Sequence, residues 1–166
     1  SHAPGSHTQE PHDATPRFPP LARGAGRDQV LFLDAPTGIS GDMTIATLLD
    51  LGVPMEVFAE TVKALFPTGV RLQPGRVIRS GIVATTVKVE VDAPPKQRDY
   101  GDIKRMLERC SLSAAVKNIA LDIFRTLAEA EAAVHHMPID SVHFHEVGAV
   151  DAIVDITCAA AGFDYL

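Results

Sequence analysis

Cysteine is scarce in this sequence, and so are long apolar runs. The two cysteines, Cys110 and Cys158, form no Cys-x-x-Cys pair, so neither a disulfide framework nor a thiolate metal site is predicted. No apolar run reaches the ~20 residues of a membrane-spanning helix, and no apolar core follows Ser1 as it would in a signal peptide. These absences favour a cytoplasmic protein with reduced thiols and no membrane partner.

Positive charge is also in short supply. Lysine and arginine total 15 against 21 aspartates and glutamates, which gives a net charge of −6. No basic patch is present to neutralise the phosphates of a nucleic acid, so that class of partner is excluded. The length of 166 residues suffices for one domain, or part of one, with a real hydrophobic core.

Residues 1–29 have the composition of a disordered tail. Prolines and glycines recur there and large apolar residues are few, so little surface is available for burial. Three histidines spaced five residues apart are compatible with weak metal binding, although a solvated tail is the favoured interpretation. We therefore expect the folded part to be residues 30–166.

The most informative stretch is residues 142–156. Its first four residues alternate apolar and polar, so a short strand there places His143 and His145 on one face. Glu146 follows directly. After Gly148 the pattern changes to that of a helix from Ala149 to Ala161.

Two aspartates on that helix add carboxylates to the imidazoles. Asp151 and Asp155 are four residues apart and share a face, where they repel each other unless a cation, a proton or a donor separates them. Nitrogen and oxygen ligands together suit zinc, nickel, iron or manganese. A hydrogen-bonded His143 and an Asp151 that complements the helix dipole are the simpler interpretations of each residue alone.

A second polar stretch follows the apolar run Val30–Leu33, which has the size of a buried strand. Ser40 is a plausible N-cap of the helix that comes next, and glycines before and after it permit a tight turn. A helix N-terminus beside such a loop favours an anion such as phosphate. An Asx-turn at Asp34 and dipole complementarity at Asp42 are the alternatives. The residues assigned to this loop are Asp34, Gly38, Ser40, Gly41 and Asp42.

The remaining pattern predicts an α/β domain with a small mixed or mostly antiparallel sheet and packed helices. Ser80-Gly81 is a hairpin turn signal between two apolar alternating segments. The last helix stops at Tyr165-Leu166 without a glycine cap or a polar tail, so we expect an incomplete N-terminal domain or one half of a split protein. The helices are expected to begin near Ser40, Pro54, Gly101, Ser113 and Ala149.

Residues 34–43 and 142–156 resemble the two signatures of the LarC family. These are the nickel-insertion proteins that complete the nickel-pincer cofactor of lactate racemase. The similarity runs from about Val30 to Leu166, and Arg98 with Asp102-Ile103 sits where the family carries an Arg-x-x-x-Asp-Ile element.

The resemblance implies nickel insertion into pyridinium-3,5-bisthiocarboxylic acid mononucleotide, a lyase-type reaction that depends on CTP with a divalent ion. The family's C-terminal domain, absent here, holds the CTP site, and lactate racemase is the downstream acceptor. The 34–43 loop then receives the mononucleotide, and a nearby carboxylate or neutral imidazole takes the ring proton, with Glu146 and Asp42 as the catalytic candidates. The metal ligands are then His143, His145, Asp151 and Asp155.

Two other classes of function fit the same residues. A metal-dependent hydrolase of a phosphorylated small molecule would use them to hold zinc or manganese and activate water. A non-catalytic scaffold would use them as a hydrogen-bond network that organises a partner domain.

Overall fold

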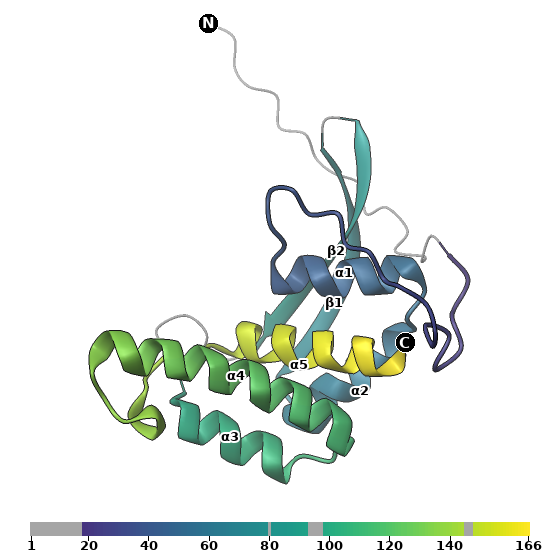
Figure 1. Ribbon diagram of the computed structural model, residues 1–166. Coiled ribbons are helices and arrows are strands. Elements are labelled where there is room, and N and C mark those ends of the chain that lie inside the picture. Colours follow the sequence, from purple (N-terminus) through teal and green to yellow (C-terminus); the bar gives the residue numbers. More distant parts are fainter. Residues whose placement is uncertain (1–17, 80, 93–97, 145–147) are drawn as a thin grey trace, which may run out of the picture.

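The computed structural model describes residues 18–79, 81–92, 98–144 and 148–166 (Figure 1). Within these ranges it contains five α-helices, one antiparallel sheet of two strands and one short 3-10 helix. The predicted α/β class with an antiparallel sheet is confirmed. The elements are α1 (Gly41–Leu51), α2 (Met55–Leu65), β1 (Val70–Arg79), β2 (Ile82–Val91), α3 (Tyr100–Arg109), α4 (Ala114–His135), η1 (Ile139–Ser141) and α5 (Val150–Tyr165).

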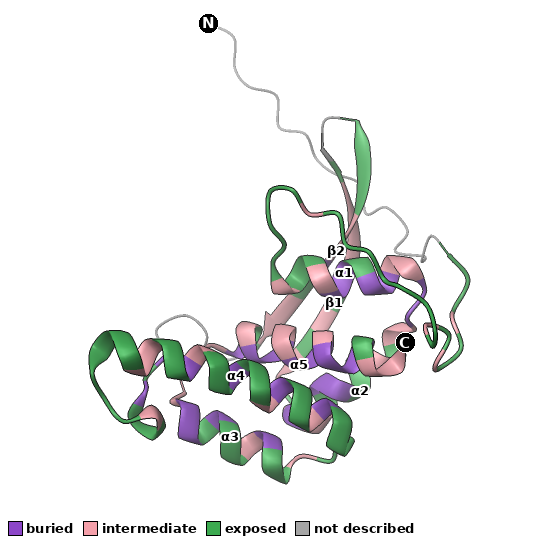
Figure 2. Ribbon diagram, in the orientation of Figure 1, coloured by how far each residue is buried: buried purple, intermediate pink, exposed green. Residues whose placement is uncertain are grey.

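Helix α5 is the central element of the fold. It packs against α1, α2 and α4, and it contributes buried residues to two separate apolar clusters. Ile153 faces the cluster built with α3 and α4, whereas Val154 and Cys158 face the one built with α1, α2 and β2. Figure 2 shows the resulting buried band along α5. Its run of small and branched apolar residues is therefore explained by burial on two sides.

The sheet is a single β-hairpin. Strands β1 and β2 pair in antiparallel register from Val70↔Val91 to Arg79↔Ile82, which confirms the predicted turn between them. Gly81 has a φ of 79°, a left-handed conformation that glycine adopts without strain. Only the inner half is covered by helices: Val87 is buried, but Ile82 is 71% exposed.

Local signals at the helix ends agree with the structure. Gly52 ends α1 in the left-handed region with a φ of 118°. The Ser113 hydroxyl accepts a hydrogen bond from the Val116 amide at 3.2 Å and so caps α4. His136 ends α4 with a φ of 51°, two residues before Pro138. None of the helices in the described ranges is long and apolar enough to cross a membrane.

The segment before α5 returns to the start of α3. The Tyr100 amide donates to the Val142 carbonyl at 3.0 Å, and the Arg98 amide donates to the Gly148 carbonyl at 3.1 Å. A Cβ on Gly148 would lie 2.9 Å from the Phe144 carbonyl oxygen and 3.1 Å from the Arg98 nitrogen. Since these are backbone atoms, only glycine fits at this position.

The prediction of a buried strand at Val30–Leu33 is wrong. The segment belongs to a loop, and Val30 and Phe32 are 93% and 82% exposed. Strands β1 and β2 pair only with each other in the described part, so no third strand position exists for this run. Apolar character alone predicts burial but not the presence of a neighbour that provides it.

Part of the predicted tail contacts the fold. The Gly24 amide donates to the Tyr165 carbonyl at 2.7 Å, and the Leu21 amide donates to the Gly52 carbonyl at 2.8 Å. Residues 18–28 thereby touch the C-terminal ends of both α1 and α5, a contact that their composition did not indicate. Residues 1–17 lie outside the described part of the chain.

The close approach at Gly148 generates a stability prediction. Gly148→Ala will lower the free energy of unfolding by about 1–3 kcal/mol, because the added methyl group meets backbone atoms that cannot rotate away. The matched control is Gly101→Ala, whose Cβ would have its nearest neighbour at 3.3 Å, on a flexible arginine side chain. Alanine favours the helix there, so the control should be neutral or stabilising. Equal urea midpoints for the two variants would contradict this account.

Candidate functional site

The first turn of α1 packs directly on α5 at one position. A Cβ on Gly41 would lie 2.7 Å from Oδ2 of Asp155 and 2.8 Å from its Cγ. Glycine is therefore required here for close packing, and it brings the backbone of α1 against a carboxyl group. These two residues are 114 positions apart in the sequence.

Among the described residues, Asp155 is the carboxyl group whose pKa is clearly shifted. Its Oδ1 atom is buried and has no hydrogen-bond partner among the described residues. Burial, followed by the negative charges of Asp42 and Asp151, raises the pKa of Asp155 to about 6, although a hydrogen bond from the Asp42 backbone partly offsets this. A buried, unpaired carboxylate oxygen is costly, so this position favours a proton or a cation.

The two neighbouring carboxylates are exposed and held by local hydrogen bonds. Asp42 accepts from the Ser40 hydroxyl and, at 2.9 Å, from the Met43 amide. Asp151 accepts from the Ala152 amide at 3.0 Å. Asp42, Asp151 and Asp155 are therefore electrostatically coupled where α1 meets the first half of α5. We call these three residues the carboxylate cluster.

Ser40 occupies the predicted N-cap position, but its hydroxyl does not cap the helix. It donates to Asp42 instead of accepting from an amide of the first turn. Before it, Gly38 has a φ of 93° and its amide donates to the Ala35 carbonyl at 3.0 Å, which forms the predicted tight turn. Asp34 is exposed on the same loop. The loop thus stands open to solvent at the N-terminus of α1.

His143 occupies a different segment. It forms an isolated β-bridge with Asp99, and it is exposed between the buried Val142 and Phe144, as the alternating pattern predicts. His145 and Glu146 lie outside the described residues. Within the described ranges, no group of three His, Cys, Asp or Glu side chains is arranged to hold a metal ion. The structure therefore brings the carboxylates together without adding His143 to them.

A groove opens beside the carboxylate cluster, between α1 and the outer half of the hairpin. Its volume is about 610 Å³, and Asp42 lies on its wall. The Thr85 hydroxyl donates to Asp50 at 3.1 Å across this groove, which links β2 to α1. Sequence reasoning missed it because no local pattern shows that the hairpin folds over α1. It is lined by Ser40, Asp42, Met43, Ala46, Thr47, Asp50, Val77, Val83, Ala84, Thr85 and Thr86.

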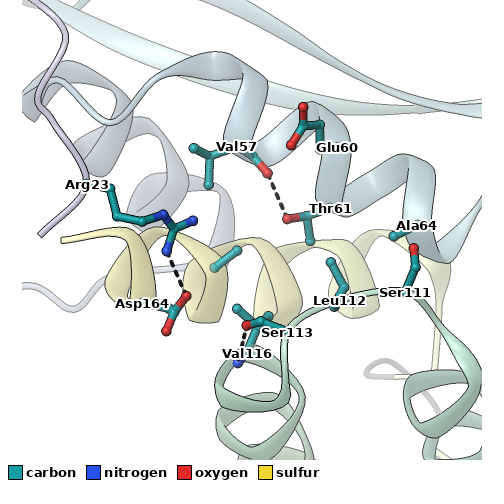
Figure 3. A pocket seen from close by; sticks show the side chains of 11 residues that line it. Arg23, Val57, Glu60, Thr61, Ala64, Ser111, Leu112, Ser113, Val116 and Asp164 are labelled. Atoms are coloured by element: carbon teal, nitrogen blue, oxygen red, sulfur yellow. Dashed lines mark hydrogen bonds and ion pairs between the residues drawn. The ribbon is translucent and has the colours of Figure 1, made fainter.

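A smaller pocket of about 290 Å³ lies between α2, the start of α4 and the end of α5 (Figure 3). Several of its polar groups are already engaged: Arg23 pairs with Asp164 at 3.1 Å, and the Thr61 hydroxyl donates to the Val57 carbonyl at 2.7 Å. Asp164 follows Asp151 by 13 residues on α5, a distance of ~20 Å along a helix. This pocket is therefore separate from the carboxylate cluster.

Comparison with known proteins identifies relatives of this chain. A family model described as nickel insertion protein matches residues 31–166. Two relatives whose names refer to nickel insertion come from Citrifermentans bemidjiense and Geobacter sulfurreducens. The first is 48% identical over 139 residues and the second 49% over 140; each match covers 83% of this chain and 36% of the relative.

A third relative carries a more specific name. It is the pyridinium-3,5-bisthiocarboxylic acid mononucleotide nickel insertion protein of Geobacillus kaustophilus, 43% identical over 142 residues, which are 80% of this chain and 34% of the relative. No solved structure matches the chain. The chain spans about a third of the length of these relatives. Because the family model covers both polar stretches and nearly all of the described fold, the chain belongs to the nickel insertion protein family.

Proposed function

We propose that this chain is the nickel-handling part of an enzyme that inserts nickel into pyridinium-3,5-bisthiocarboxylic acid mononucleotide. Family membership and the name of the Geobacillus kaustophilus relative support the reaction. The observation that best supports a metal site here is the buried Oδ1 of Asp155, which has no hydrogen-bond partner among the described residues. In this proposal Ni²⁺ is a substrate that supplies the missing positive charge.

The carboxylate cluster explains why a divalent cation would bind. Asp155 alone would favour a proton, but Asp42 and Asp151 add negative charge that a single proton does not balance. Oxygen ligands alone hold nickel weakly and with little selectivity, whereas imidazole suits it well. We therefore assign His143 and His145 as the nitrogen ligands and Asp151 and Asp155 as the oxygen ligands. Because His143 does not lie with the carboxylates in this structure, the proposal requires the segment that carries the two histidines to approach them when nickel binds.

The anionic substrate requires an order of binding. Its phosphate and two thiocarboxylates would be repelled by three clustered carboxylates. Bound nickel reverses that repulsion, so nickel enters first and the mononucleotide second. The open loop with Asp34, Gly38 and Ser40, together with the α1 N-terminus at Gly41, then receives the phosphate. The ring lies over the groove beside Asp42.

The chemical step replaces one carbon–hydrogen bond of the pyridinium ring by a carbon–nickel bond and releases one proton. Both thiocarboxylate sulfurs also bind the nickel. We assign Glu146 as the base that takes the proton, because it adjoins the proposed ligand His145, and Asp42 as the group that assists it. CTP with a divalent ion belongs to the part of the family chain outside this match, and lactate racemase is the proposed acceptor of the product.

Nickel binding should depend on pH through Asp155. Nickel must displace the proton from a carboxyl with a pKa of about 6, so affinity will fall about tenfold from this group between about pH 7.5 and about pH 5. Calorimetric titration measures this directly. Asp155→Asn should bind at least tenfold more weakly at the higher pH, while the exposed control Asp140→Asn binds like the parent chain. Full affinity in Asp155→Asn would remove the carboxylate cluster from the site.

Without metal, the same carboxyl should cost stability. Its pKa is raised in the folded state from the value near ~3.9 of an unfolded chain, so the folded state binds the proton more tightly. Stability therefore falls as pH rises from about 4 through about 6. Because the group is partly exposed, we expect Asp155→Asn to gain only about 1 kcal/mol at about pH 7.5 and little at about pH 4. Equal urea midpoints for variant and parent at the higher pH would contradict the pKa assignment.

The base assignment has its own test. Glu146→Gln keeps the size of the side chain but cannot accept the proton, so in a full-length relative the corresponding change should slow insertion by about 100-fold or more. Nickel affinity should remain unchanged, which separates this effect from loss of the metal. Unaltered insertion rates would show that Glu146 is not the base.

A further inference from the structure

An exposed apolar face extends beyond α1. We define it by the exposed large apolar residues of three segments: the loop segment Val30–Leu33, the start of α1 at Ile39 and Met43, and the tip half of the hairpin at Ile78, Ile82 and Val83. Figure 1 shows the loop and the hairpin both reaching past α1, on the side away from α4 and α5. Figure 2 shows the same loop and hairpin tip as exposed.

The segment Val30–Leu33 has the composition of a strand but no partner. All four residues are apolar and exposed, with Phe32 at 82%. No backbone hydrogen bond joins them to another residue in the described part of the chain. An extended apolar segment with free amides and carbonyls is suited to adding a strand to another sheet.

This segment belongs to the family domain and not to the preceding tail. The family model begins at residue 31 and includes Leu31, Phe32 and Leu33. The match covers 36% of the Citrifermentans bemidjiense relative, so roughly two thirds of that polypeptide lies outside it. The relatives' own chain therefore contains further polypeptide that is available to cover this face.

The groove beside the carboxylate cluster shares Met43 and Val83 with this face. Met43, Val77 and Val83 line it, so the tip of the hairpin and the first turns of α1 share one hollow surface. Contiguous exposed apolar surface of this kind marks an interaction site. A partner seated there would contact Met43 while remaining next to Asp42.

We propose that this apolar face is the docking surface for the remaining two thirds of the family polypeptide, and that Val30–Leu33 pairs with a strand of that part. Docking would bury the run that the sequence marks as a strand. It would also fix the 34–43 loop, which follows Leu33 directly, and so complete the substrate side of the carboxylate cluster. A second copy of this chain is the competing occupant.

Hydrogen exchange tests the proposal. The amides of residues 31–33 should exchange freely in this 166-residue chain and at least 100-fold more slowly in the matching peptide of the unmodified full-length Citrifermentans bemidjiense relative. Similar fast exchange in both proteins would overturn the proposal. Slow exchange in this chain that is lost on dilution would overturn it in favour of a second copy.

A chimera supplies the matched variants. In it, residues 18–166 of this chain replace the matching part of the relative, and Phe32→Asp is compared with Phe18→Asp, a 52% exposed phenylalanine outside the family match. Phe32→Asp should restore fast exchange at residues 31–33 and split thermal unfolding into two transitions, whereas Phe18→Asp should change neither. Equal behaviour of the two variants would overturn the proposal. The readouts require no nickel, so their failure is distinguishable from failure of the nickel site.

Discussion

The contact between Gly41 and Asp155 is the constraint on which the candidate site depends. It places the first turn of a helix against a carboxyl group with no space for a side chain between them. That packing buries Oδ1 of Asp155 and brings it under the influence of Asp42 and Asp151. A group in this state is poorly satisfied by the protein itself, which is the reason for the proposal that a metal substrate binds there.

The position of α5 makes this contact possible. Its apolar residues pack into two clusters at once. This packing fixes the rotation of the helix about its axis and so fixes the direction of its polar residues. Ile153, Val154 and Cys158 supply the burial, while Asp151 and Asp155 appear at the end of the α1–α5 contact. Packing against two apolar clusters leaves this helix little freedom to relax, so the buried carboxylate is held in place.

Burial of the apolar surface beyond α1 competes with access to the groove beside Asp42. A domain that closed its whole apolar surface would also close the groove beside Asp42, through which we propose that the substrate reaches the cluster. Instead, Val83 at the hairpin tip stays exposed beside that groove, and Val30–Leu33 is exposed as well. The proposed docking therefore has two effects. It buries the apolar face, and it fixes the position of the loop that carries Asp34, Gly38 and Ser40. In this scheme the part of the relatives' polypeptide that lies outside the match helps to form the site.

Much of the local structure was determined by short stretches of sequence. Several features follow from short-range sterics and side-chain alternation, which need no distant partner. They are the pairing of β1 with β2, the αL end of α1 at Gly52, the Ser113 cap and the exposure of His143 between Val142 and Phe144. The family resemblance, carried by residues 34–43 and 142–156, was also available from sequence and is confirmed by the family model. Only the tertiary structure decided that Gly41 meets Asp155, that the hairpin folds beside α1, and that Val30–Leu33 lacks a neighbouring strand. Each of these is a contact, or a missing contact, between segments far apart in the chain, and periodicity shows that a residue seeks burial without showing what will bury it.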